Sequence, residues 1–235
     1  MKGDPKYPKP EFLKFAGRRK GRPLREGREE AFNAVTDQFA VPVPATDVKT
    51  DPRDYFPNRP EKLWLEIGFG NGEHLIGQAM RHPEIGFIGC EPFINGVSAA
   101  SKDVVRNDLK NIRFWSDDAM ALLPHLKPES FDRIFLLFSD PWPKKRQHKR
   151  RVIQPNTVSL FASLLRKGGE LRLATDHPDL AEWMLIHVND SKLFKRLPDE
   201  TADWSAIPSD WIETRYQQKA ALQGRLPFFM DFAKI

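Results

Sequence analysis

A glycine-rich turn, Glu66-Ile67-Gly68-Phe69-Gly70-Asn71-Gly72, lies between an apolar run and an amphipathic segment. The glycines Gly68, Gly70 and Gly72 would let the backbone approach a ligand closely, and the helix that follows would offer unpaired N–H groups. Their G-x-G-x-G spacing differs from the G-x-G-x-x-G of dinucleotide binders. Glu66 is placed to face a cationic ligand such as the ammonium group of methionine. Alone, the turn also fits a tight structural turn or another nucleotide site.

Two more acidic residues follow the next two apolar runs. Glu91, after the second run, is placed to accept hydrogen bonds from both ribose hydroxyls of an adenosine. Asp118, after the third, is placed to accept one from the exocyclic amine of adenine. Either residue alone could be a strand-end cap. Because ligands of open parallel sheets bind at the carboxyl ends of the strands, the three acids together predict an S-adenosylmethionine site.

A second set of residues suits a nucleobase. Asp140-Pro141-Trp142-Pro143-Lys144 follows the apolar run Phe131–Phe138, so the Asp140 carboxylate is expected beside the cofactor, although a surface turn is the alternative. Asp176 ends the fifth apolar run. Guanine presents N1–H and N2–H₂ donors, so a pair of carboxylates suits it, whereas cytosine and adenine present acceptors there.

A basic octet, Lys144-Lys145-Arg146-Gln147-His148-Lys149-Arg150-Arg151, follows immediately. Cationic side chains pair with phosphates and aromatic faces stack on unpaired bases, so this segment predicts RNA contact. A nuclear signal or a solvated face would have the same composition. Basic residues are also concentrated in residues 1–30, and the net charge of the chain is +5. The residues expected to contact RNA are Lys145, Arg146, His148, Lys149, Arg150 and Arg151.

The chain alternates short apolar runs with amphipathic segments, which predicts an α/β fold with a mostly parallel sheet and helices on both faces. The last two extended runs, Leu193–Leu197 and Phe228–Ile235, are expected to pair as an antiparallel edge at the C-terminus. A helix is expected from Pro155 to a glycine cap at Lys167-Gly168-Gly169. The expected strands are Leu63–Ile67, Gly86–Cys90, Ile112–Trp115, Phe131–Phe138 and Glu170–Ala174.

Residues 1–60 are rich in proline and arginine and predict an extended basic arm, with at most one short helix near Glu29–Gln38. Residues 61–235 are expected to form the folded domain. No apolar run approaches the roughly 20 residues that span a bilayer, so a cytoplasmic protein with no membrane contact is expected. The single cysteine, Cys90, is interpreted as a buried apolar residue, and the sequence predicts no metal site. Nothing in it indicates an obligate protein partner.

Over nearly its whole length the sequence resembles the bacterial tRNA (guanine-N7-)-methyltransferases, the TrmB family. The matching stretches are Gly17-Arg18-Arg19-Lys20-Gly21-Arg22, Leu65-Glu66-Ile67-Gly68-Phe69-Gly70-Asn71-Gly72, Phe138-Ser139-Asp140-Pro141-Trp142-Pro143-Lys144, Lys149-Arg150-Arg151 and Ala174-Thr175-Asp176. The resemblance implies a Rossmann-like class I S-adenosylmethionine-dependent methyltransferase that modifies N7 of the variable-loop guanine of tRNA.

The resemblance also implies roles for individual residues. Glu66, Glu91, Asp118 and Asp140 would line the cofactor site, with Asp140 as the catalytic residue. The residues implied to contact substrate are Lys144, Asp176, Thr214, Arg215, Tyr216 and Gln217. The family usually has Glu where this chain has Gln217, and an amide forms hydrogen bonds but supplies no charge.

Three other classes of protein fit parts of the pattern. A non-catalytic RNA-binding protein would explain the basic segments but not the three acids. A methyltransferase acting on a small molecule or a protein would not need the basic octet. A nicotinamide-dependent oxidoreductase is disfavoured by the glycine spacing.

Overall fold

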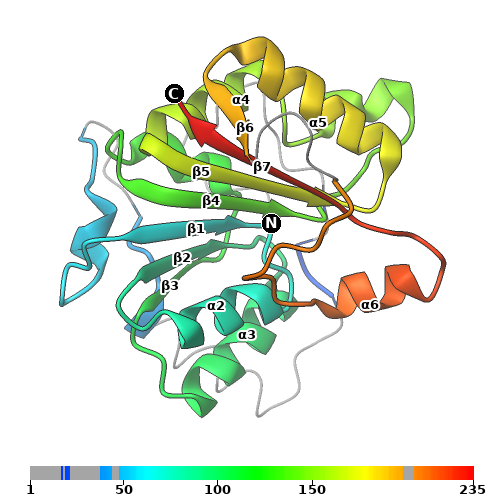
Figure 1. The fold of residues 1–235 in the computed structure, drawn as a ribbon. Coiled ribbons are helices and arrows are strands. Elements are labelled where there is room, and N and C mark those ends of the chain that lie inside the picture. Colours follow the sequence, from blue (N-terminus) through cyan, green and yellow to red (C-terminus); the bar gives the residue numbers. More distant parts are fainter. Residues whose placement is uncertain (1–16, 18, 22–37, 44–47, 198–203) are drawn as a thin grey trace.

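The structure, a computed structural model, describes residues 17, 19–21, 38–43, 48–197 and 204–235. Its centre is a seven-stranded sheet in the order β3-β2-β1-β4-β5-β7-β6, with helices on both faces (Figure 1). The strands are β1 (Leu63–Ile67), β2 (Gly86–Cys90), β3 (Ile112–Trp115), β4 (Phe131–Leu137), β5 (Leu165–Thr175), β6 (Phe194–Leu197) and β7 (Phe228–Lys234).

Strands β1 to β5 are parallel, while β7 runs antiparallel to both β5 and β6. The expected antiparallel pairing of the last two extended segments is therefore confirmed. The C-terminal strand β7 lies second from the edge, with β6 outside it. The first five predicted strands are all present, and β1, β2 and β3 have the predicted bounds.

Each face of the sheet has its own helices. Helices α2 (Glu73–Arg81) and α3 (Ile94–Arg106) cover one face, and α4 (Pro155–Leu164) and α5 (Pro178–Ser191) cover the other (Figure 1). Helix α6 (Arg215–Ala221) lies near the carboxyl ends of the strands. Short 3-10 helices connect the elements: η1 (Pro52–Tyr55), η2 (Ala119–Ala121), η3 (Leu123–His125) and η4 (Lys145–Arg150).

The alternation of side chains along the strands produces two cores. Leu63, Leu65 and Ile67 of β1 belong to the core under α4 and α5, whereas Trp64 belongs to the core under α2 and α3. Glu66 shares the face of Trp64. This alternation decides which strand-end side chains can reach the site described below.

Part of the predicted arm packs into these cores. Phe39 and Val41 are buried, and a single bridge joins Ala40 to Phe114 of β3. Phe56, directly after η1, is also buried. The packed part of the chain therefore begins before residue 61. The helix predicted near Glu29–Gln38 lies almost wholly outside the described residues, which resume at Gln38.

The predicted end of the helix that starts at Pro155 is wrong. Helix α4 ends at Leu164, and Leu165 already pairs with Phe131 of β4. The register then shifts, and Gly168, with a φ of 74°, lies in a bulge of β5. A glycine with positive φ suits a bulge as well as a helix cap, and the pairing partner on β4 is remote in sequence.

Among the described residues, no helix is long and apolar enough to cross a membrane. Within the same part of the chain, no group of three or more His, Cys, Asp and Glu side chains could hold a metal ion. Cys90 is buried, as expected, and burial raises the pKa of its thiol.

Candidate active site

A cavity of about 500 Å³ opens at the carboxyl ends of β1, β2 and β4. Gly68 and Gly70 have φ angles of 75° and 58°, which place the turn in a conformation that favours glycine. At Gly96 of α3 an added Cβ would lie 2.2 Å from the Gly70 carbonyl oxygen, so helix and turn approach closely. The cavity is lined by Gly17, Ile67, Gly68, Cys90, Glu91, Pro92, Phe93, Asp118, Ala119, Met120, Leu136, Phe138, Ser139, Asp140, Trp142, Arg150 and Val152.

Glu91 is the carboxylate most firmly fixed in this cavity. Its Oε2 accepts a hydrogen bond from the Gly70 N–H at 2.8 Å, and its Oε1 accepts one from the Phe93 N–H at 2.8 Å. Burial raises the pKa of Glu91, and the nearby carboxylates of Asp140 and Glu66 raise it further, while the two N–H donors lower it. The side chain is therefore oriented with lone pairs still available to a ligand hydroxyl.

Asp118 also lines the cavity, and it caps η2 by accepting a hydrogen bond from the Met120 N–H at 3.1 Å. Apolar side chains, among them Ile67 and Leu136, complete the lining. The volume, the two buried carboxylates and the apolar walls fit S-adenosylmethionine, whose ribose and adenine need such partners. The predicted positions of Glu91 and Asp118 in one site are thus observed.

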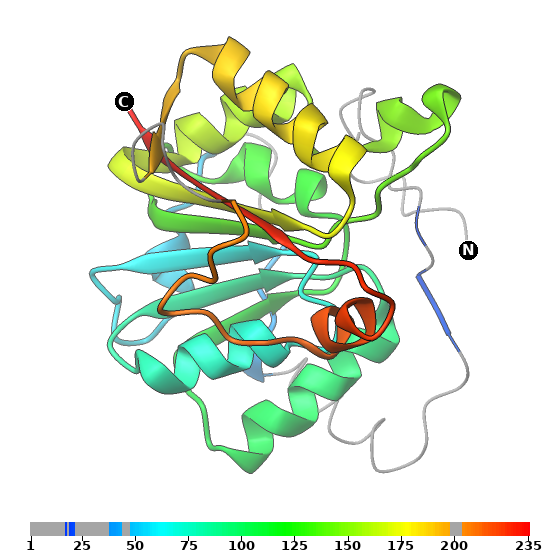
Figure 2. The ribbon, with the colours of Figure 1, turned by 45° about the vertical axis from the view of Figure 1, so that its right-hand side comes forward.

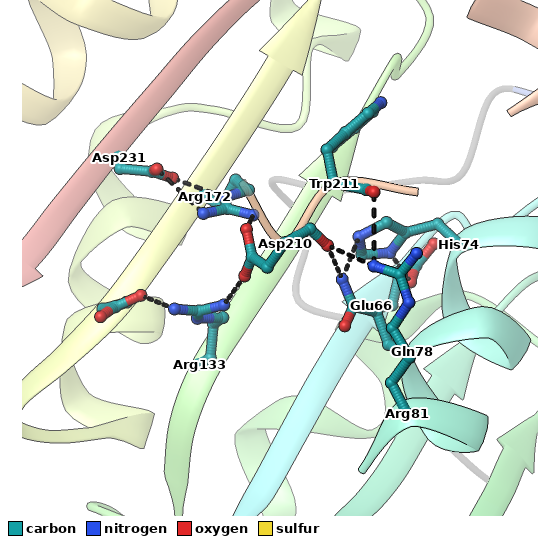
Figure 3. Close-up of polar contacts among 10 residues, drawn as sticks. Glu66, His74, Gln78, Arg81, Arg133, Arg172, Asp210, Trp211 and Asp231 are labelled. Carbon is teal, nitrogen blue, oxygen red and sulfur yellow. Dashed lines mark hydrogen bonds and ion pairs between the residues drawn. The ribbon is translucent and has the colours of Figure 1, made fainter. Parts of the chain in front are cut away.

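Glu66 differs from expectation. Its carboxylate is buried on the opposite face of the sheet, where Oε2 is 2.7 Å from Nδ1 of His74 in α2 (Figure 3). Glu66 is not among the described residues that line the cavity, because Ile67 takes the inward position in the pleat. Its contact supports the turn from behind rather than facing a ligand.

Asp140 lies at the mouth of the cavity in a strained loop. Phe138 and Trp142, on either side of it, have φ angles of 50° and 43°, in the left-handed region that non-glycine residues rarely adopt. The Phe138 N–H donates to the Ala174 carbonyl at 2.7 Å, which anchors the loop to β5. The guanidinium of Arg150 lies 4.9 Å from the centroid of the Trp142 ring. Surrounding contacts therefore hold a conformation with an exposed carboxylate.

Asp176 follows β5 and is buried beside α6. Its Oδ2 is paired with the guanidinium of Arg225, and its Oδ1 accepts from the Tyr216 hydroxyl at 3.3 Å. The Tyr216 ring lies 5.2 Å from that of Phe138, which lines the cavity. Arg225 had no signal in the sequence, because it lies in a loop far along the chain from Asp176.

The basic octet is largely exposed, with Lys144 at the N-cap of η4 and Lys145, Arg146 and Lys149 on the surface. Arg151 corrects the prediction, because its side chain is 0% exposed and paired with Asp179. Its Nε donates to the Pro141 carbonyl at 3.0 Å. Arg151 therefore supports the Asp140 loop from inside the protein, where it cannot contact RNA.

The segment Thr214–Gln217 begins α6. Thr214 caps the helix by accepting from the Gln217 N–H at 3.2 Å, and Arg215 and Tyr216 are exposed. Gln217 instead is buried, and its Oε1 accepts from Nε1 of Trp211 at 2.7 Å. Three of the four residues of this segment are thus accessible, and the fourth, Gln217, is directed inward.

The short N-terminal piece of the described chain lies on the side of the molecule where the parallel strands end, as the blue segment of Figure 2 shows. Gly17 lines the cavity, and Arg19 pairs with Asp117 at 2.6 Å. The Gly21 N–H donates to the Asn95 side chain at 2.8 Å. The described residues of the first stretch of the resemblance, 17 and 19–21, therefore lie against the cavity and the elements beside it.

The sheet order, the single antiparallel strand β7 and a cavity at the carboxyl ends that fits S-adenosylmethionine define a class I methyltransferase. Structures with this fold include the 16S rRNA methyltransferase KamB, at a TM-score of 0.58 and 14% identity, covering 83% of this chain and 97% of that one. Another is an antibiotic-related methyltransferase, at a TM-score of 0.54 and 20% identity, covering 81% and 96%.

A family described as "Putative methyltransferase" matches residues 60–230. Among the most similar relatives, the tRNA (guanine-N(7)-)-methyltransferase of Rhodospirillum rubrum is 42% identical over 226 residues, which cover 95% of this chain and 89% of that protein. The protein of the same name from Caulobacter vibrioides is 41% identical, covering 94% and 95%. The chain belongs to the bacterial tRNA (guanine-N(7)-)-methyltransferase family.

Proposed function

We propose that this chain transfers the methyl group of S-adenosylmethionine to N7 of the variable-loop guanine of tRNA. The observation that carries the proposal is the arrangement of Asp140 and Glu91 in one cavity, with an exposed basic segment beside it. Relatives about 40% identical, which carry the name tRNA (guanine-N(7)-)-methyltransferase, support the same substrate.

The cofactor half of the proposal rests on the lining of the cavity. Glu91 would accept hydrogen bonds from the ribose hydroxyls, and Asp118 would accept one from the adenine amine. Gly68 and Gly70 leave open space beside their backbone, so a ligand can lie against the turn. When bound, S-adenosylmethionine supplies a methyl group on a positively charged sulfur.

The acceptor half follows from the chemistry of guanine. N7 has an in-plane lone pair and carries no proton, so methyl transfer to it needs no general base, and orientation provides most of the rate acceleration. Positive charge develops on the purine during transfer, and the carboxylate of Asp140 would stabilise it electrostatically. We therefore assign Asp140 to orientation and charge stabilisation. Lys144 would donate to guanine O6 or to a phosphate, because a donor on N7 would block the nucleophile.

Asp176 and Tyr216 are proposed to read the base. The buried Asp176 carboxylate suits the N1–H and N2–H₂ donors of guanine, and the exposed Tyr216 ring offers a stacking surface beside it. Asp176 is already paired with Arg225, so binding of the base in this way requires that pair to open.

Affinity for tRNA is assigned to the exposed basic residues of the octet and to the basic arm of residues 1–60. Cations that pair with phosphates give binding that is largely independent of sequence and steeply dependent on salt. Arg151 is left out of this set because of its burial. The proposed substrate is tRNA in the cytoplasm.

One experiment tests the reaction and its main alternative together. Unmodified tRNA is incubated with the enzyme and S-adenosylmethionine carrying a radiolabelled methyl group, and the modified base is mapped by its aniline-sensitive cleavage. Label at a cleavable guanine of the variable loop is expected. Binding of tRNA without label would indicate a non-catalytic RNA-binding protein, and label on another base or a protein would also overturn the proposal.

A further inference from the structure

Asp210 anchors the segment that leads into α6. Its Oδ1 accepts from Nη1 of Arg172 at 2.7 Å, and its Oδ2 accepts from Nη1 of Arg133 at 2.6 Å (Figure 3). These arginines lie on the neighbouring strands β5 and β4, and Arg172 is held a second time by Asp231 at 2.7 Å. The two arginines hold the pKa of Asp210 below its ordinary value despite its partial burial. The anchor is therefore ionised and attached to the centre of the sheet.

The backbone of Asp210 is tied to the cofactor side as well. Its carbonyl oxygen accepts from Nε2 of Gln78 in α2 at 2.8 Å. Gln78 lies one helical turn after His74, which contacts Glu66 behind the glycine-rich turn (Figure 3). The segment is thus fixed both to the sheet and to the helix that follows the cofactor turn.

Trp211 connects this anchored segment to α6. Its indole is 8% exposed and packs against the rings of His74 and Phe229, with centroids 5.2 Å and 4.7 Å away. Its Nε1 donates to Oε1 of Gln217, which is 6% exposed, at 2.7 Å. A hydrogen bond between two buried groups costs much to break, because each group would lose its partner without gaining water.

The atom used at position 217 shows which side chains could serve there. Trp211 needs an acceptor, and both the amide oxygen of Gln and a carboxylate oxygen of Glu supply one. Gln217 begins the inward face of α6, while its neighbours Arg215 and Tyr216 are exposed. The side chain is therefore placed to hold the helix rather than to contact tRNA.

We propose that Trp211 and Gln217 form a positioning pair that fixes Arg215 and Tyr216, the exposed residues at the start of α6, at the acceptor site. In this pair, position 217 requires a hydrogen-bond acceptor and no charge. The inference rests on the proposed function, in which Tyr216 and its neighbours contact tRNA. It adds Trp211, as a hydrogen-bond donor, to the residues that support this site. It also assigns Gln217 to holding α6 in place instead of contacting tRNA.

The test uses variants of the full chain and separates tRNA binding from cofactor binding. Gln217→Leu removes the acceptor, Trp211→Phe removes the donor, and Gln217→Glu keeps an acceptor while adding a charge. We expect each of the first two to raise the KM for tRNA about tenfold, with the Kd for S-adenosylmethionine unchanged. Gln217→Glu should stay within about twofold of the wild type.

The double variant Trp211→Phe/Gln217→Leu gives the interaction directly. Because it removes donor and acceptor together, it should be less impaired than the sum of the two single changes. Gln218→Leu is the matched control, since Gln218 is the next residue of α6 and is exposed. It should retain the wild-type KM, and thermal unfolding of all variants confirms that they are folded.

Several outcomes would contradict the proposal that Trp211 and Gln217 form a positioning pair. They are a wild-type KM in Gln217→Leu, strictly additive effects in the double variant, equal damage from Gln217→Glu, or a parallel loss of cofactor affinity. Tyr216→Ala tests the assumption, taken from the proposed function, that Tyr216 contacts tRNA. A wild-type KM for tRNA in this variant would show that it does not. If Tyr216→Ala raises the KM and Gln217→Leu does not, only the positioning pair fails.

Discussion

The site has two regions: the cavity proposed to bind the cofactor, called the cofactor half, and the region proposed to receive guanine, called the acceptor half. They are built from different kinds of contact. In the cofactor half, at the ends of β1 to β3, carboxylates are held by backbone N–H groups. Glu91 accepts from Gly70 and Phe93, and Asp118 accepts from Met120. These donors belong to the turns themselves, so the strand ends fix the geometry of the cofactor half.

In the acceptor half, after β4 and β5 and along α6, side chains are held by other side chains. Asp176 is paired with Arg225, and Trp211 donates to Gln217. Asp176 and Arg225 are 49 residues apart in sequence, so their pair depends on the loop after α6 lying against the end of β5. Trp211 and Gln217 are six residues apart, and their bond fixes the start of α6. Substitutions in this half should therefore alter tRNA parameters and leave the cofactor affinity unchanged.

The largest effect is expected at Asp140, where the two halves meet. Asp140→Asn keeps the size of the side chain and removes its charge, so the purine loses its electrostatic partner during transfer. We expect kcat at saturating tRNA and cofactor to fall about 100-fold. Radiolabelled methyl transfer measures kcat, and equilibrium binding should give a nearly unchanged Kd for S-adenosylmethionine. Full kcat in this variant would show that Asp140 has no charge-stabilising role.

Glu91→Gln tests the cofactor half alone. Loss of a charged acceptor for two ribose hydroxyls should weaken S-adenosylmethionine binding about 10- to 100-fold, with little change in the KM for tRNA. Titration of the cofactor into the free enzyme measures the Kd.

The same site predicts a dependence on pH. Because burial raises the pKa of Glu91, its carboxylate becomes protonated at a higher pH than an ordinary glutamate as the solution is acidified. Cofactor affinity of the wild type should therefore decrease as pH falls through this raised pKa. The Glu91→Gln variant is the control, and an equal slope in both proteins would assign the titration to another group.

The sequence predicted the cofactor half better than the acceptor half for a physical reason. Strands and the acids that follow them are encoded by local apolar runs, so the bounds of β1 to β3 were confirmed, and Glu91 and Asp118 line one cavity. Glu66 was misplaced because one step in the strand pleat moves a side chain to the other face. Local patterns give the end of a strand more reliably than the direction of its last side chains.

The remaining errors, in the basic octet, in α4 and in the acceptor half, have a different origin. Arg151 ends a run of exposed cations, and only the carboxylate of Asp179 on α5 and the Pro141 carbonyl make its burial favourable. The helix predicted to continue past Leu164 ended early because Leu165 pairs with β4. In both cases the deciding partner is remote in sequence. Asp210, Trp211 and Arg225 were missed for the same reason.

Substitutions in the basic octet should have a smaller effect on tRNA binding, and they separate the role of its exposed cations from that of the buried Arg151. The triple variant Lys145→Gln/Arg146→Gln/Lys149→Gln should weaken tRNA binding about fivefold at physiological salt, since exposed ion pairs contribute little each. The dependence of log Kd on log salt should become shallower by about 0.7–0.9 per lost phosphate contact. Arg151→Gln is the comparison: it should lower thermal stability and leave the salt dependence unchanged. An unaltered slope in the triple variant would remove the octet from the tRNA interface.

The smallest effect is expected at Arg225. It tests whether Asp176 is available to guanine before tRNA binds. The guanidinium occupies the Asp176 carboxylate that is proposed to read guanine, so the base must displace it. The arginine side chain is 42% exposed, so the pair is partly screened by water and the penalty is modest. Arg225→Gln should therefore lower the KM for tRNA about threefold at high salt, where the general attraction of the cation for phosphates is screened.

Lys219→Gln, on the exposed surface of α6, removes the same charge without touching Asp176. It should leave the KM unchanged at high salt and raise it at low salt. If Arg225→Gln instead raises the KM at every salt concentration, Arg225 binds tRNA directly, and the acceptor half is as fully formed before binding as the cofactor half. A lowered KM would mean that the acceptor half is completed only when guanine replaces an internal cation.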